Sequence, residues 1–288
     1  MTTGNFYSFY GFSDTNMIRY HNTTTPWVLG LIGSTNYTDP VSGEGPCTDT
    51  PMFTYRDLEN PETDVSLAWF PDIEYCDNLS MVNQYGLDMI YGVSEINNGS
   101  NQDLLFFRGN PSLWTPDDAN LINNTITSNE NLLHPKIGVK GDNIFIVAET
   151  DTQGIVLYRS SDKGDHWSSP IYLTQAILPP SSNPQYPDIF INQTHLVSTF
   201  IESGNLSVSI SSDSGNSWAT PIKLNTQNNS VVPGYSYTNF GISDQIVWTD
   251  NRNGNDDIYY YVGYIPSADL KVINFTLSKD IPLSLIHI

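Results

Sequence analysis

A repeat of about fifty residues constrains the fold of this 288-residue chain more than any other feature. The segment Ser160–Pro170 recurs as Ser211–Pro221, and the two tryptophans, Trp167 and Trp218, are 51 residues apart. A period of this length is typical of a chain that repeats one supersecondary unit. Each unit buries its apolar face against its neighbours, so several copies are needed to make a stable fold.

Weaker copies extend the repeat toward the N-terminus. The tryptophan of Phe107–Trp114 lies 53 residues before that of the first strong copy, and Ile18–Trp27 is more degenerate. The interval between the tryptophans of these two weaker copies exceeds one period by about 36 residues. We expect the excess to be a loop insertion near residues 40–75, which includes Glu44–Pro61.

Each repeat contains four short segments with strand character, separated by turn signals such as Ser203–Gly204 and Asn253–Gly254. The next two repeats begin near Tyr186 and Tyr237. A four-stranded sheet repeated radially is the blade of a β-propeller. The sequence therefore predicts an all-β fold, a β-propeller of four-stranded blades with about five blades visible. The strands predicted around the first strong copy are Lys136–Lys140, Ile144–Glu149, Gly154–Ser160 and Ile171–Thr174.

Both strong copies match S-x-D-x-G-x-x-W and resemble the Asp-box, or BNR repeat, of sialidase-like β-propellers. The resemblance implies a structural role, in which Ser and Asp accept turn N–H bonds and Gly supplies an unusual backbone angle. The Trp would pack between neighbouring sheets. The structural residues are then Ser160, Asp162, Gly164, Trp167, Ser211, Asp213, Gly215 and Trp218. Propellers of this type usually have six blades, so we expect an N-terminal truncation.

Three segments divide the chain. Residues 1–265 form the propeller, and 266–282 resemble the opening strand of an Ig-like adhesion module of the CARDB type, with a closing propeller strand as the alternative. Residues 283–288 resemble the translation of a transposase-end adapter, so we expect an artefact tail. No signal peptide precedes residue 1, so either the chain is not exported or its start is missing.

The cysteines and glycosylation sequons suggest a compartment. Cys47 and Cys76 form either a disulfide or two unpaired thiols. Nine N-x-S/T sequons fit an exported glycoprotein, located outside the cell or on its surface. They are Asn22, Asn36, Asn78, Asn98, Asn123, Asn192, Asn205, Asn228 and Asn274.

A second pattern consists of carboxylates at the ends of the predicted second strands, and we expect them on the face opposite the Asp-boxes. The candidate ligand face comprises Asp14, Glu95, Glu149, Glu202 and Asp250, together with Arg252. Clustered carboxylates suit Ca²⁺, sugar hydroxyls or acid–base work on glycosides. The alternative is that each carboxylate caps its own hairpin. No other cofactor is indicated.

The resemblance also implies what a sialidase would need: three arginines on a substrate carboxylate, a Tyr–Glu nucleophile pair and an Asp acid/base. The chain has five arginines, and Arg19, Arg108 and Arg159 precede the Asp-box positions, toward the other face. Only Arg252, and Arg56 in the insertion, remain to face a ligand. The early Arg motif of the F-R-I-P kind is absent, so we assign no catalytic residue.

Charge and hydropathy exclude other classes. Eleven Lys and Arg face 31 Asp and Glu, and the net charge of −20 disfavours nucleic-acid binding. No apolar run approaches the ~18 residues of a membrane span. We expect a non-catalytic extracellular propeller for recognition or adhesion, with a glycan or a cell-surface protein as ligand. The alternatives are a sialidase-type glycoside hydrolase with part of its site outside this fragment, and a purely structural surface repeat.

Overall fold

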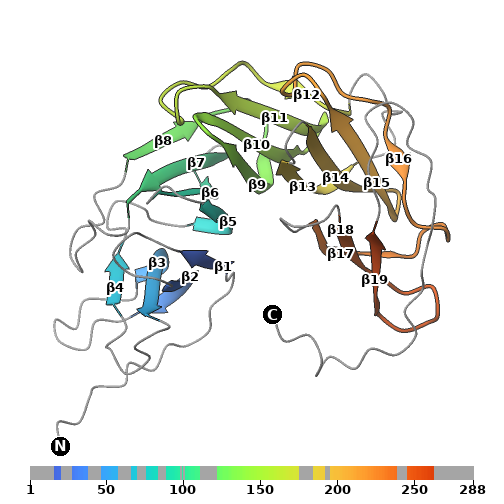
Figure 1. Cartoon of the computed structure of the whole chain (residues 1–288), viewed down its shortest axis with the longest axis horizontal. Helices are drawn as coiled ribbons and strands as arrows, with labels where there is room; N and C mark the ends of the chain where they lie inside the picture. Colours follow the sequence, from blue (N-terminus) through green and yellow to red (C-terminus); the bar gives the residue numbers. More distant parts are fainter. Residues whose placement is uncertain are drawn as a thin grey trace, which may run out of the picture. The chain divides into compact units, whose positions relative to one another are not determined.

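A computed structural model describes residues 16–20, 28–37, 47–57, 66–69, 76–83, 89–97, 99, 101–110, 122–174, 184–191, 195–238 and 245–262. These residues form nineteen strands in five antiparallel sheets and no helix (Figure 1). Four sheets have four strands and the last has three, and in each the strands follow chain order. None of the described segments is a helix that could cross a membrane.

The first two sheets comprise β1 (Asn16–Tyr20), β2 (Val28–Tyr37), β3 (Cys47–Asp57) and β4 (Ser66–Trp69), then β5 (Cys76–Asn83), β6 (Ile90–Asn97), β7 (Gln102–Gly109) and β8 (Ile122–Ile126). The third contains β9 (Leu132–Lys140), β10 (Asn143–Thr150), β11 (Gly154–Ser160) and β12 (Ile171–Tyr172). The fourth contains β13 (Gln185–Ile191), β14 (Leu196–Glu202), β15 (Asn205–Ser211) and β16 (Ile222–Lys223). The fifth contains β17 (Val231–Thr238), β18 (Gln245–Asp250) and β19 (Asp257–Val262).

Several second and third strands are buried along almost their whole length. In β10, every residue from Ile144 to Thr150 is buried, as are Leu206–Ser211 of β15. β10 is mostly apolar, as expected for a strand that is covered on both faces, whereas β15 alternates apolar residues with small serines. The turn between β14 and β15 has two consecutive left-handed residues, Ser203 (φ 48°) and Gly204 (φ 70°), which match the twist of a two-residue hairpin.

The structure corrects the expected insertion. Residues Cys47–Asp57, assigned in part to a loop, form β3, which pairs with β2 over most of its length. The excess over one period predicted a loop, but the Met52–Tyr55 run has the aromatic and alternating character of a strand. Arg19 lies in β1, the first strand of its sheet, so the Ile18–Trp27 segment does not occupy the position of the strong copies.

The chain divides into two compact units, and the division passes through β11. One unit contains Met1–Asp151 and Tyr158–Ser169, and the other contains Thr152–Leu157 and Pro170–Ile288. In the first unit β5 contacts both β1 and β9, and in the second β13 contacts β17. First strands therefore meet first strands between neighbouring sheets of a unit. The second unit has an apolar core that includes Val197, Val208 and Trp248.

Several predictions from the sequence fall outside the described residues. Among them are Asp14, Trp27, Trp114, the Ig-like segment 266–282 and the tail 283–288. Cys47 and Cys76 open β3 and β5, and their pairing stays a prediction.

Candidate functional site

The two strong repeats form the same turn after the third strand of their sheets. In Ser160–Trp167, between β11 and β12, the Ser160 hydroxyl donates to Asp162 Oδ1 (2.7 Å) and accepts from Gly164 N–H (2.8 Å). Asp162 Oδ1 accepts the N–H of His166 (3.0 Å). In Ser211–Trp218 the matching bonds run from Ser211 to Asp213 (2.8 Å), from Gly215 to Ser211 (2.8 Å) and from Ser217 to Asp213 (2.9 Å). These side chains hold the turns closed.

The seventh residue of each turn, which the S-x-D-x-G-x-x-W pattern leaves open, differs between the two copies. His166 Nδ1 lies 2.7 Å from Asp162 Oδ2, and the equivalent Ser217 hydroxyl donates to Asp213 Oδ2 (2.7 Å). The backbone and side-chain hydrogen bonds from His166 hold the pKa of Asp162 well below its usual value, and the same contact raises the pKa of His166. Hydrogen bonds from Ser217 lower the pKa of Asp213 to about 2.

The first turn is fastened to strand β7 of the preceding sheet. Arg108 donates from Nη1 to the carbonyl of Lys163 (2.7 Å) and from Nη2 to Asp165 Oδ1 (2.7 Å). Phe106 packs under the turn, with its ring edge-on to Trp167 at 5.1 Å between centroids. Gly164 has φ of 94°, and a Cβ there would lie 2.1 Å from the Phe106 ring, so the site requires glycine.

The predicted ligand-face carboxylates lie on the second strands of their sheets. Glu95 is in β6, Glu149 is in β10, and Glu202 and Asp250 end β14 and β18. Glu95, Glu149 and Asp250 are buried, and Glu202 is half-buried. The structure brings Glu95 and Glu149 together around one histidine, whereas Asp250 has a separate set of partners.

The His134 cluster consists of Asn78, Glu95, His134 and Glu149, all in the first unit. Glu95 Oε1 accepts the amide N–H of His134 (2.5 Å) and the side-chain N–H of Asn78 (2.8 Å). The His134 ring places Nδ1 3.0 Å from Glu149 Oε2, with 28% of the His134 side chain exposed and 8% of that of Glu149. The imidazole is therefore oriented by one carboxylate, its backbone is held by another, and part of its ring meets solvent.

A bulge in the first strand sets this geometry, and sequence reasoning missed it. Asn78, His134 and Tyr186 have φ of 50°, 49° and 50°. Each lies in the first strand of its sheet, where the pairing register with the second strand shifts. A bulge re-aims a side chain and is often found beside a functional site. The available signal was the common register of these residues, at intervals of 56 and 52 along the chain.

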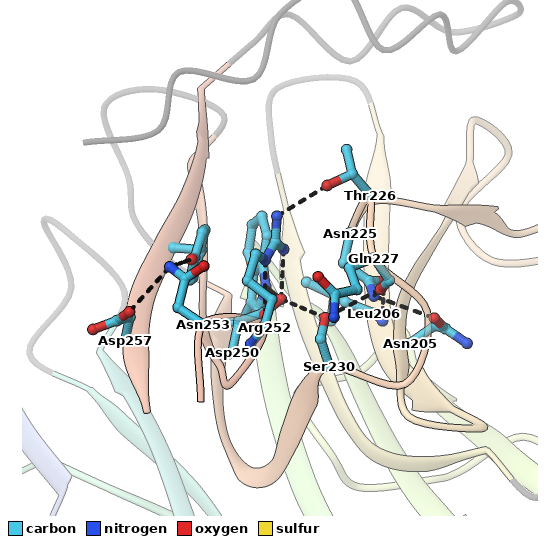
Figure 2. A network of polar contacts seen from close by, with 12 residues as sticks. Asn205, Leu206, Asn225, Thr226, Gln227, Ser230, Asp250, Arg252, Asn253 and Asp257 are labelled. Atoms are coloured by element: carbon cyan, nitrogen blue, oxygen red, sulfur yellow. Dashed lines mark hydrogen bonds and ion pairs between the residues drawn. The ribbon is translucent and has the colours of Figure 1, made fainter. Parts of the chain in front are cut away.

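Asp250 is the centre of a second polar network, in the other unit (Figure 2). Its carboxylate accepts five hydrogen bonds: from Ser230 Oγ (2.9 Å), Trp248 Nε1 (3.1 Å) and the N, Nε and Nη2 atoms of Arg252 (3.0, 2.8 and 2.5 Å). Burial opposes ionisation of this carboxyl, but the donors outweigh it and lower the pKa of Asp250. Asp250 thus caps its own hairpin.

Arg252 is committed to protein groups. Besides Asp250, it donates from Nη1 to Thr226 Oγ1 (2.9 Å), and its guanidinium lies 4.0 Å from the centre of the Tyr259 ring. Only 10% of its side chain is exposed. The hydrogen bonds to Asp250 raise the pKa of Arg252. The guanidinium of Arg252, the arginine of the candidate ligand face, therefore lies between Asp250 and Thr226 (Figure 2).

Two further predictions concern metals and glycans. Within the described residues, no group of three or more His, Cys, Asp or Glu side chains could hold a metal ion. Binding of Ca²⁺ stays a prediction that a shift in melting temperature would test. Of the sequons, Asn78 donates its Nδ2 to Glu95, and Asn205 donates its Nδ2 to the carbonyls of Glu202 (3.3 Å) and Ser203 (3.0 Å). The nitrogen that a glycan would occupy is engaged at both positions.

Comparison with known proteins identifies the fold. No protein-family model and no curated protein sequence matches this chain. The family 43 endo-arabinanase of Bacillus licheniformis matches with a TM-score of 0.50 and 13% identity, over 88% of this chain and 94% of that one. The phage phi92 endosialidase matches with a TM-score of 0.51 and 11% identity, over 94% and 50%. For the Podospora anserina α-L-arabinofuranosidase the values are 0.46 and 9%, over 65% and 63%.

These matches define the class of fold. This chain spans less than two thirds of the arabinofuranosidase and half of the endosialidase. At 11% and 13% identity, the likeness is one of fold alone. Together with the four-stranded antiparallel sheets, it shows an all-β, sialidase-like β-propeller. The fold predicted from the repeat is confirmed, with five sheets in the described part of the chain.

Proposed function

We propose that this chain is a non-catalytic, extracellular or cell-surface β-propeller that recognises glycans through the His134 cluster. The observation that carries the proposal is the partly exposed His134 imidazole, whose ring contacts the buried carboxylate of Glu149 and whose backbone N–H is held by Glu95. The ring nitrogens of an imidazole and the oxygens of a carboxylate are atoms with which sugar hydroxyls form hydrogen bonds. Because both carboxylates are already positioned by hydrogen bonds, little ordering is required when a ligand binds.

The fold and the composition support a carbohydrate ligand in an exported protein. Two of the matching folds belong to an endo-arabinanase and an endosialidase, both named for carbohydrate substrates. The sequons and the paired number of cysteines favour export, and the net charge of −20 keeps such a protein soluble. A surface protein as ligand would be recognised, on this proposal, through its glycans.

A hydrolase is the second candidate, favoured by one observation. Glu95 and Glu149 both contact His134, and glycoside hydrolysis commonly uses two carboxylates. Glu95, however, already accepts two N–H bonds through the same oxygen, from Asn78 and from the His134 backbone. Such a carboxylate is occupied as a structural acceptor, which favours binding over catalysis.

A glycan array with the full chain tests the proposal. We expect binding to at least one glycan class, with affinity at least about tenfold lower for His134→Ala, a loss of roughly 1.4 kcal/mol. The matched control is His166→Ala, a histidine that also contacts a carboxylate but whose side chain is 89% exposed in a turn. A blank array at high protein concentration would contradict the proposal and favour a structural repeat. Release of sugar from a bound glycan, lost in Glu149→Gln, would favour the hydrolase.

A further inference from the structure

The charges around His134 restrict the kind of sugar that this site can take. Glu95 and Glu149 are 3% and 6% exposed. Glu149 lies 3.0 Å from the His134 ring, and Glu95 accepts the backbone N–H of His134. An acidic sugar bound at His134 would meet the charges of these two carboxylates in a partly buried place, where repulsion is weakly screened.

Two of the described arginines, Arg108 and Arg252, are directed at groups of the chain itself. Recognition of a carboxylate or sulfate in proteins relies on the fork of an arginine. In the first unit, Arg108 directs both Nη atoms at the Ser160–Trp167 turn. In the second unit, Arg252 directs its Nε and Nη2 atoms at Asp250. Both guanidinium groups neutralise internal carboxylates rather than presenting a fork to a ligand.

The net negative charge of the whole protein also disfavours binding of an acidic sugar. A net charge of −20 lowers the local concentration of anions near the surface and raises that of cations. This effect is screened by salt, so it is strongest at low ionic strength. Short-range and long-range electrostatics therefore both oppose an acidic glycan.

We propose that the His134 cluster binds uncharged or amino sugars and excludes acidic ones, including sialic acid. The inference rests on the proposed function, since it names the ligand class of that same site. In an uncharged sugar, hydroxyl groups exchange hydrogen bonds with the exposed part of the imidazole, which Glu149 orients. In an amino sugar, the negative charges of the buried Glu95 and Glu149 attract the ammonium group and lower the free energy of the bound cation.

Three oligosaccharides of equal length test the inference: an N-acetylglucosamine oligomer, its de-N-acetylated form, and a uronic acid oligomer. Binding to the immobilised full chain is measured by interferometry at low and at physiological salt. We expect the first two to bind, with the amino form favoured at low salt by about tenfold or less. We expect no binding of the acidic form at ten times the concentration that half-saturates the neutral one.

Variants connect the selectivity to the site. Glu149→Gln keeps the shape and an acceptor oxygen but removes the charge, so the preference for the amino form over the neutral form should fall to about one. His134→Ala should weaken the binding of both oligomers, and His166→Ala should change neither.

If the acidic oligomer binds and His134→Ala abolishes that binding, the charge inference is wrong while the proposed function stands. If none of the three binds and the wider array is also blank, both are wrong. Binding that is unaffected by His134→Ala and Glu149→Gln overturns the assignment of this site.

Discussion

The Asp250 network and the His134 cluster each contain a carboxylate near the end of a second strand, but the two carboxylates have different partners. Asp250 and Glu149 each lie at the end of a second strand. Asp250 is fully buried and accepts three of its five hydrogen bonds from Arg252, two residues along the chain. Glu149 contacts a partly exposed histidine from a different strand. The partner of the carboxylate, rather than the carboxylate itself, therefore decides whether the site stabilises the fold or is accessible to solvent.

Burial explains why this difference should appear in stability measurements. A buried ion pair gains little over an apolar pair of the same shape, but removing one member leaves the other charge unpaired in a dry environment. A partly exposed pair loses less, because water can replace the missing partner. We therefore expect the Asp250 network to dominate stability and the His134 cluster to dominate binding.

The largest effect is expected for Asp250→Asn. The substitution leaves Arg252 without its counter-charge, at 10% side-chain exposure, so we expect a loss of about 3–5 kcal/mol in the free energy of unfolding. The control is Asp257→Asn, in the same hairpin but exposed, with an expected change within about 0.5 kcal/mol. Chemical denaturation, with hydrogen exchange of residues 245–262 to localise the effect, measures both. Equal stability of the two variants would remove the distinction between the network and the cluster.

The pH dependence sharpens the same comparison. The folded-state pKa of Asp250 is lowered, so its contribution to stability is complete above the ordinary carboxyl pKa of 3.8 and is lost as the pH falls below it. Asp250→Asn should therefore flatten the acid limb of the stability profile. The wild type and variant should converge as the pH falls, and a constant offset between pH 7 and pH 2 would contradict this origin.

A smaller effect is expected for Arg252→Lys. Lysine retains the charge opposite Asp250 but loses the fork that places Nε and Nη2 on both carboxylate oxygens, and it loses the planar contact with Tyr259. We expect a loss of about 1–3 kcal/mol, between that of Asp250→Asn and that of the exposed control. Tyr259→Phe separates the contribution of the aromatic ring from that of the hydroxyl. It keeps the ring under the guanidinium and removes only the hydroxyl that accepts from Asn253 (2.9 Å).

The sequence was sufficient for the parts of the structure that depend on short-range pattern. The repeat, the two-residue turn at Ser203–Gly204 and the carboxylates at the ends of second strands follow from residue type and spacing. The orientation of His134 could not be predicted, since it depends on a register shift between β9 and β10. The contact of Arg252 with Asp250 is local and fits the alternative that the carboxylate caps its own hairpin. The burial of the pair could not be predicted, since it depends on Tyr259 of β19 and on Thr226 and Ser230 before β17.

For Glu149→Gln we expect the opposite of Asp250→Asn, namely a small change in stability and a clear change in glycan binding. It removes a charge from a residue whose partner His134 is 28% exposed, and glutamine can still accept from the ring, so we expect a stability change of about 1 kcal/mol or less. Glycan binding should nevertheless change as described above. Denaturation and interferometry on the same preparation compare the two readouts. A destabilisation as large as that of Asp250→Asn would make Glu149 a structural residue and contradict its assignment to a ligand site.

The smallest effect is expected at the exposed His166–Asp162 pair, which repeats the His134–Glu149 contact with 89% and 41% of the side chains exposed. The folded-state pKa of His166 is raised, so its contribution is complete below the ordinary value of 6.5 and is lost as the pH rises through the raised value. Asp162, with its lowered pKa, contributes above 3.8 and loses that contribution as the pH falls. The first turn is therefore favoured in a window bounded on both sides. The second turn, with Ser217 in place of histidine, is limited only on the acid side, as Asp213 approaches its pKa of about 2.

An NMR titration of the His166 ring should give a midpoint above 6.5 that returns toward 6.5 in Asp162→Asn. In His166→Ser the alkaline decline attributable to this turn should disappear while the acid decline remains. A His166 midpoint unaffected by Asp162→Asn would show that the contact does not persist in solution, and that burial is what distinguishes the His134 pair from it.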